Sequence, residues 1–89
     1  MDIKFIYHSA EWCGPCKRYW PQVLRWSVEL NAEVTKVDLS DGFVDDIKSV
    51  PTMDVVVGGT RKLRVTQWGP GTKARVLEAI NDGEFGGVL

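Results

Sequence analysis

The only two cysteines of the chain, Cys13 and Cys16, are separated by two residues and lie between an apolar run and an amphipathic stretch. If Cys13 lies at the N-cap of a helix, Cys16 follows about one turn later on the same face. This spacing keeps the two Cα atoms within the roughly 4.4–6.8 Å that a disulfide allows. The unpaired N–H groups and partial positive charge of a helix N-terminus stabilise a thiolate at Cys13. The pair therefore predicts reversible dithiol–disulfide exchange, with Cys13 as the nucleophile.

The residues around the two cysteines support this prediction. Pro15 suits the first turn of a helix, where its missing N–H is not needed, and Lys17 adds a nearby cation. We expect Gly14 and Pro15 to tune the redox couple through the rigidity of the helix start. Two alternatives stay open, a zinc site and a structural disulfide. Zinc takes about four N or S ligands, and besides carboxylates the chain adds only His8; a disulfide across so short a loop removes little chain entropy.

Length and charge limit the protein class. The 89 residues suit one domain, which we place at residues 1–83, with 84–89 as a fraying tail. Eleven basic and twelve acidic residues give a net charge of −1, which favours neither nucleic acid nor a membrane surface as a partner. The apolar run near the N-terminus is too short for a secretory signal or a membrane span. We expect a cytoplasmic monomer without a metal ion, because paired thiols in that compartment are usually catalytic.

The hydrophobic pattern predicts seven elements in the order β-α-β-α-β-β-α. They are a strand over 3–8, a helix over 13–31, a strand over 34–39, a short helix over 43–47, strands over 53–57 and 63–68, and a helix from 72 to about 83. Gly58-Gly59 is typical of a hairpin turn between the last two strands. A right-handed crossover makes the first two strands parallel.

The segment from Ala10 to Lys17, AEWCGPCK, resembles the active-site segment of thioredoxins. The resemblance extends from about Ile3 to Asn81, and it continues through Pro21, Lys36-Val37-Asp38, Val50-Pro51-Thr52 and Gly69. It implies an α/β thioredoxin-like fold, with a four-stranded mixed sheet of order 2-1-3-4 flanked by three helices. The family's first strand and helix are missing, so the chain resembles a compact thioredoxin of about glutaredoxin length.

The resemblance also implies roles for individual residues. Cys16, half buried, would resolve the mixed disulfide that Cys13 forms. A cis bond between Val50 and Pro51 would place the Val50 backbone beside the sulfurs, where it pairs with an extended substrate. Gly69 would form the third wall of this groove, and the alternative is an ordinary loop glycine. Trp12 would be a partly exposed lid, with a packing role as the alternative.

The chain departs from the family at Tyr7, where thioredoxins carry a buried aspartate that relays a proton of the second cysteine. Lys36 matches the family's lysine beside that aspartate. With a reference pKa of about 10, a phenol is a weak base at neutral pH, so Tyr7 would relay a proton poorly and a water could replace it. The alternative is that Tyr7 fills the core while Lys36 reaches solvent or an acidic neighbour. For His8 we favour packing at the strand end.

Two groups of charged residues could select a partner surface, although most such groups are solvated faces. We expect the acidic group and the basic group on different elements. The acidic group is Asp38, Asp41, Asp45 and Asp46, and the basic group is Arg61, Lys62 and Arg64.

Together these features predict a protein-disulfide reductase of cell redox homeostasis and electron transport. By resemblance, a thioredoxin-reductase-type flavoenzyme would recharge it. NADPH would then act only indirectly, no cofactor would be bound, and disulfide-containing proteins such as ribonucleotide reductase would be substrates. One alternative is a glutathione-dependent, glutaredoxin-like enzyme. Glutaredoxins use a glycine pair before the last helix, whereas Gly58-Gly59 is expected in a hairpin, and this argues against the alternative. The other is a non-catalytic docking subunit, which would not need both cysteines.

Overall fold

Four strands form one mixed sheet, and two helices pack against it, in the computed structural model, which describes residues 2–44 and 46–85. The elements are β1 (Ile3–Ser9), α1 (Gly14–Leu30), β2 (Glu33–Asp38), β3 (Thr52–Val57), β4 (Thr60–Val65) and α2 (Thr72–Phe85). The strand order β2-β1-β3-β4 confirms the predicted order. β1 and β2 are parallel, as a crossover through α1 requires, and the other two pairs are antiparallel.

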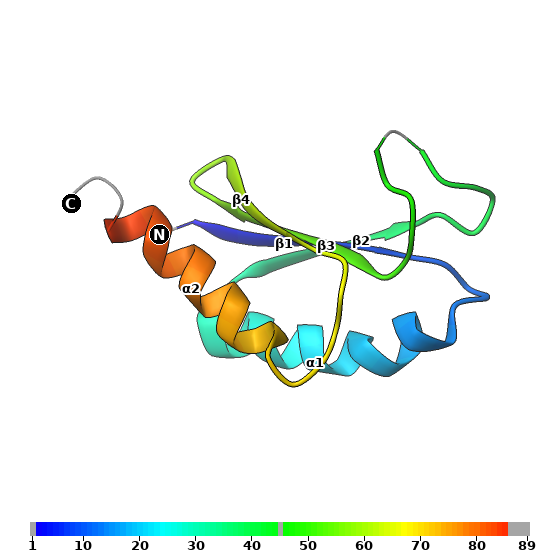
Figure 1. Ribbon diagram of the computed structural model, residues 1–89, viewed down its shortest axis with the longest axis horizontal. Coiled ribbons are helices and arrows are strands. Elements are labelled where there is room, and N and C mark those ends of the chain that lie inside the picture. The colour runs from blue at the N-terminus through cyan, green and yellow to red at the C-terminus, as the bar shows by residue number, and fades with distance from the viewer. Residues whose placement is uncertain (1, 45, 86–89) are drawn as a thin grey trace.

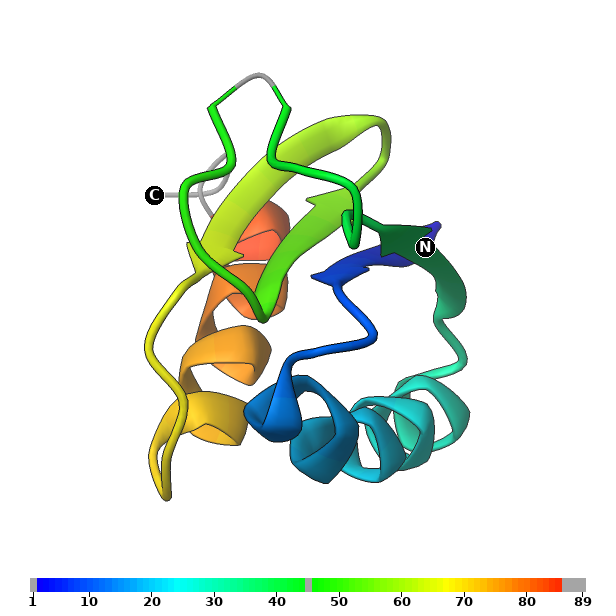
Figure 2. The same cartoon turned by 90° about the vertical axis from the view of Figure 1, so that its right-hand side faces the viewer.

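Both helices lie on the same side of the sheet, α1 across β1 and β2, and α2 across β3 and β4 (Figures 1 and 2). Alternate residues of a strand point to one face, so Phe5 and Tyr7 of β1 both face the helices. The core between the two layers contains fully buried Phe5, Tyr7, Val23, Val55, Val65 and Val76. β1 therefore contributes buried side chains to the core. A short turn then leads from β1 directly to the two cysteines.

The predicted helix over 43–47 is wrong, so the fold has two helices instead of three in the described residues. Phe43, Val44, Asp46 and Ile47 lie in a turn-rich segment that rises over the other side of the sheet (Figure 2); residue 45 lies outside the described residues. Serine is a common N-cap residue, but Ser40 bonds to the Asp38 side chain through its N–H and its hydroxyl. With no cap and few residues, a helix nucleus is unfavourable here.

Two other boundaries differ from the sequence prediction. At the hairpin turn, Gly58 and Gly59 have φ values of 58° and 84°, which glycine adopts without strain. Thr60 therefore pairs with Val57 at once, and β4 lies earlier than the predicted strand over 63–68. The last helix continues past Gly83 to Phe85, two residues into the expected tail, and residues 86–89 lie outside the described part.

Candidate redox-active site

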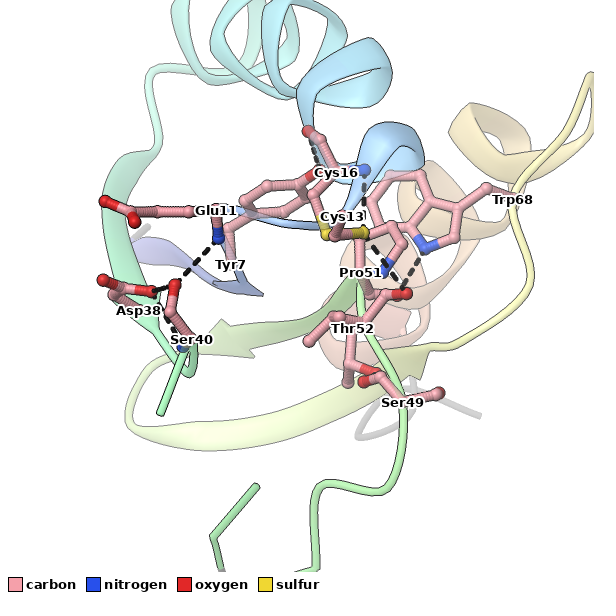
Figure 3. Close-up of a disulfide and its surroundings, with 11 residues drawn as sticks. Tyr7, Glu11, Cys13, Cys16, Asp38, Ser40, Ser49, Pro51, Thr52 and Trp68 are labelled. Carbon is pink, nitrogen blue, oxygen red and sulfur yellow. Dashed lines mark hydrogen bonds between the residues drawn. A yellow bond between two sulfur atoms is a disulfide. The ribbon is translucent and has the colours of Figure 1, made fainter. Parts of the chain in front are cut away.

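The first turn of α1 holds the two cysteines, joined as a disulfide (Figure 3). Cys13 is the N-cap residue with extended backbone angles, and its Sγ accepts a hydrogen bond of 3.1 Å from the Cys16 N–H. The two Cα atoms are 5.3 Å apart. A backbone N–H that points at Cys13 Sγ, together with the helix dipole, stabilises negative charge on this sulfur. This is the helix-start arrangement that the spacing of the cysteines predicts.

Both cysteines are buried, whereas Cys16 was expected to be only half buried. Their exposed fractions are 5% and 3%, because Ala10 and Val50 pack against the pair. In the disulfide form, little of either cysteine is therefore in contact with solvent.

The Val50–Pro51 segment forms the wall opposite the helix start. Its peptide bond is cis, as the resemblance implies. Val50 O lies 3.7 Å from Cys13 Sγ, and this contact becomes a hydrogen bond only when reduction gives the sulfur a proton. Pro51 O accepts a hydrogen bond of 2.8 Å from Trp68 Nε1, and Thr52 Oγ1 donates to Ser49 O at 2.8 Å. The backbone beside Cys13 is therefore held by side chains on both sides.

Trp12 stands beside the disulfide as an exposed side chain in a fixed orientation. Its exposed fraction is 62%, and its Nε1 donates to Ser40 O at 3.2 Å. Ser40 Oγ also accepts a hydrogen bond from Glu11 N at 2.8 Å. The Trp12 ring lies 6.2 Å from the half-exposed ring of Phe43, measured between centroids. This exposure favours a surface role for Trp12 over a core-packing role.

Gly69 caps the start of α2. Its N–H donates to Thr72 Oγ1 at 2.8 Å, and its carbonyl accepts from Thr72 N at 3.1 Å. A Cβ at this position would meet open space. Gly69 lines a surface cavity between α1 and the start of α2, together with Tyr19, Trp26 and Lys73, and this cavity does not include the cysteines. These contacts favour the alternative of a loop glycine.

The side chain of Tyr7 in β1 contacts the first turn of α1, which carries the cysteines. It is fully buried, and its hydroxyl donates a hydrogen bond of 2.7 Å to Cys16 O. Burial, with a smaller contribution from Tyr19, raises the pKa of Tyr7 to about 12. Because the hydroxyl already donates its proton to a carbonyl and its pKa is far above neutrality, this geometry argues against Tyr7 as the proton acceptor of Cys16.

A cavity of about 730 Å³ lies beside Cys16. Its lining includes Glu11, Cys16, Lys17, Trp20, Lys36 and Asp38. The Lys36 ammonium lies 4.7 Å from the centroid of Trp20, a cation–π contact. Lys17 and Lys36 therefore both border the space next to Cys16.

The charged groups expected on different elements partly neutralise each other. Arg64 binds Asp54 through Nε at 2.7 Å and Asp46 through Nη1 at 2.6 Å, and Arg61 lies 4.0 Å from Asp46. His8 Nε2 lies 3.4 Å from Asp54, so His8 joins this network at the strand end. Arg64 thus ties the segment before Val50 to β3, and its ion pairs argue against a free basic surface.

Substitution of Asp54 by asparagine should remove a pH-dependent part of the stability. Burial raises the pKa of Asp54, but the hydrogen bond and charge of Arg64 outweigh it and hold the pKa below its usual range. A lowered folded-state pKa stabilises the protein above the unfolded value of about 3.9, and this contribution is lost as the pH falls below it. The difference in unfolding free energy between wild type and Asp54→Asn should therefore shrink below about pH 4.

Urea unfolding at pH 7 and at pH 3 measures this difference. Asp41→Asn, at an exposed position, is the control. A difference between wild type and Asp54→Asn that is unchanged at pH 3 would mean that Asp54 keeps an ordinary pKa.

Two contributors to the site were not predicted as site residues from the sequence, Trp68 and Ser40. Trp68 holds Pro51 O, and Ser40 holds Trp12 and Glu11. A half-buried tryptophan needs an acceptor for its N–H, which was a usable signal for Trp68. No comparable signal marked Ser40, because its partners depend on how the loop folds.

No three His, Cys, Asp or Glu side chains come together as metal ligands within residues 2–44 and 46–81. Neither helix of the described chain is long and apolar enough to cross a membrane.

Comparisons with known proteins agree with this geometry. The family model "Thioredoxin" matches residues 2–82. A thioredoxin from Mycoplasma genitalium is 32% identical over 78 residues, which cover 82% of this chain and 74% of that protein. Mitochondrial thioredoxin O2 from Arabidopsis thaliana is 32% identical over 67 residues, covering 67% of this chain. The chain spans only 42% of that plant protein.

Solved structures give the same result. The crystal structure of oxidised thioredoxin O2 from Arabidopsis thaliana has a TM-score of 0.71 at 26% identity, covering 85% of this chain and 72% of that one. Thioredoxin 1 from Thermosipho africanus has a TM-score of 0.72 at 13% identity, covering 91% and 97%, and supports the fold alone. Thioredoxins use a redox-active disulfide and need no bound cofactor. With its family model matched over nearly the whole length and its Cys13–Cys16 disulfide, the chain belongs to the thioredoxin family.

Proposed function

We propose that the protein is a protein-disulfide reductase that works through the Cys13–Cys16 pair. The observation that carries this proposal is the position of Cys13 Sγ, between the Cys16 N–H at 3.1 Å and Val50 O at 3.7 Å. The N–H stabilises a thiolate, and the Val50 backbone offers an edge against which an extended substrate segment pairs.

The reaction transfers two electrons from the dithiol to the substrate. The Cys13 thiolate attacks one sulfur of the substrate disulfide, a mixed disulfide forms, and the other substrate sulfur leaves and takes up a proton. The Cys16 thiolate then attacks Cys13 Sγ, the bond from Cys13 to the substrate breaks, and the second substrate thiol is released. The cavity beside Cys16 supports a proton route from Cys16 to solvent, without a buried aspartate.

A thioredoxin-reductase-type flavoenzyme recharges the disulfide in this proposal, with NADPH as the distant electron source. Family membership supports this partner, and it supports disulfide-containing proteins as substrates, with ribonucleotide reductase as one candidate. A cytoplasmic monomer fits these roles, since reductases of this class keep thiols reduced there.

The glutathione-dependent alternative has less support. Gly58 and Gly59 form the β3–β4 turn, far along the chain from the start of α2, and so are not available to bind glutathione there. A docking subunit without catalysis would not need a thiolate-stabilising N–H at Cys13, so the site geometry argues against it.

Consumption of NADPH with oxidised insulin as substrate separates these functions. One arm contains thioredoxin reductase, and the other contains glutathione with glutathione reductase. We expect turnover through thioredoxin reductase to be the faster. Faster turnover through glutathione would support the glutaredoxin-like function, and no turnover in either arm or with dithiothreitol would support the docking subunit.

A further inference from the structure

Two aromatic side chains each bind one backbone carbonyl, on opposite sides of the disulfide. The Tyr7 hydroxyl donates to Cys16 O at 2.7 Å, and Trp68 Nε1 donates to Pro51 O at 2.8 Å. The rings of Tyr7 and Trp68 pack edge to face with their centroids 5.8 Å apart. A continuous path of contacts therefore joins the helix turn that carries the cysteines to the backbone segment that faces Cys13 (Figure 3).

Both rings are fixed by packing on other sides. Tyr7 is fully buried and lies 5.2 Å from the Trp20 ring of α1. Trp68 stacks on Tyr19 at 5.1 Å and on Trp26 at 6.2 Å, two residues of α1 that are seven positions apart. Close packing on these sides restricts the movement of both rings. The two hydrogen bonds are thus made by donors whose positions the surrounding rings restrict.

The two bonded carbonyls lie where disulfide exchange is sensitive to position. Cys16 O belongs to the first turn of α1, so its hydrogen bond restrains the residue whose sulfur must attack Cys13. Pro51 O follows directly after Val50, whose carbonyl lies 3.7 Å from Cys13 Sγ. Sulfur attack needs a near-linear approach, and small misplacements of reacting groups cost large factors in rate.

We propose that Tyr7 and Trp68 are positioning residues for disulfide exchange. Tyr7 sets the approach of Cys16 to the mixed disulfide, and Trp68 sets the Val50–Pro51 edge along which a polypeptide substrate is bound. This inference rests on the exchange reaction proposed above. It assigns to Tyr7 a role other than proton transfer, and it adds Trp68 to the site.

Two conservative variants test the two roles separately. Tyr7→Phe deletes only the hydroxyl and should slow resolution of the mixed disulfide about three- to tenfold, the range for one neutral hydrogen bond, with its formation nearly unchanged. Trp68→Phe deletes the N–H and should raise the KM for oxidised insulin by about the same factor. Its turnover of hydroxyethyl disulfide, which is too small to pair with the Val50 edge, should stay near the wild-type value.

The two steps are followed by acid quench and mass measurement, with dithiothreitol as the reductant so that no reductase enters the result. Tyr19→Phe and Trp26→Phe are the matched controls, because they delete the same atoms from neighbouring rings of the same cluster. Thermal melts show whether each variant is folded. The controls should change the melting temperature, but they should not slow resolution more than formation of the mixed disulfide, nor affect insulin more than hydroxyethyl disulfide.

The inference is overturned if Tyr7→Phe and Trp68→Phe leave these rates and the insulin KM unchanged. It is also overturned if they slow both steps and both substrates equally, as a purely structural role would. Absence of exchange in the wild-type protein would instead contradict the proposed function. If Trp68→Phe unfolds, Trp68→Tyr replaces it in the test. The tyrosine hydroxyl would not occupy the position of the Trp68 N–H, so this variant also lacks the donor to Pro51 O.

Discussion

Replacement of Cys13 by serine is expected to abolish disulfide reduction, whereas replacement of Cys16 is expected to trap the substrate on Cys13. Only Cys13 Sγ receives a backbone N–H at the helix start, so it is the sulfur stabilised as a thiolate. The Cys16 N–H belongs to the backbone and remains in Cys16→Ser. That variant therefore keeps an activated nucleophile but lacks the sulfur that releases the substrate.

Mass measurement after incubation with oxidised insulin reads out both variants. Cys16→Ser should gain the mass of whole insulin, whose second interchain disulfide still joins its two chains, and dithiothreitol should remove it. Cys13→Ser should remain unmodified. An adduct on Cys16 in Cys13→Ser, with none on Cys13 in the other variant, would reverse the order of attack.

Tyr7→Asp is expected to cause the largest loss of stability. The substitution deletes a fully buried ring that packs on Trp20 and Trp68, and it introduces a carboxyl group in its place. Loss of a buried aromatic side chain alone costs about 3–5 kcal/mol, and burial of a carboxyl group adds to it. Tyr7→Phe, which keeps the ring, should cost only about 1 kcal/mol.

The loss in Tyr7→Asp should also depend on pH. Burial raises the pKa of a carboxyl group, so the variant is most stable below the unfolded value of about 3.9 and loses stability as the pH rises. Urea unfolding at pH 4 and pH 7 measures this dependence. If Tyr7→Asp is as stable as wild type at pH 7, Lys36 or a water compensates for the charge, and the site tolerates the acid that other thioredoxins carry.

The redox pair could be predicted from the sequence because its chemistry is local. The N-cap position of Cys13 and its hydrogen bond from Cys16 N follow from a two-residue spacing at a helix start. The strand order and the cis Val50–Pro51 bond followed from the family resemblance, because hydrophobic periodicity does not determine which strands are neighbours. The burial of Cys13 was missed, since it depends on Val50 and Ala10 packing over the sulfur.

The remaining differences arise from contacts between distant segments. The side chain of Ser40 bonds to Asp38 and to the backbone of Glu11, and the predicted helix over 43–47 is replaced by a loop. The role of Tyr7 depends on which carbonyl its hydroxyl reaches, 9 residues along the chain. Trp68 was predicted as the last residue of a strand over 63–68, but it lies outside the observed β4, because the tight Gly58-Gly59 turn shifts β4 toward the N-terminus.

Electron transfer from the reduced protein to oxidised insulin, with no other reductant present, tests the central claim most directly. The protein is reduced with dithiothreitol, freed of it, and mixed with insulin, and both partners are followed by mass after acid quench. We expect Cys13 and Cys16 to become a disulfide in step with the appearance of insulin thiols, one bond formed for each bond broken. Insulin disulfides that stay intact, or that open while both cysteines remain reduced, would contradict a dithiol reductase built on Cys13 and Cys16.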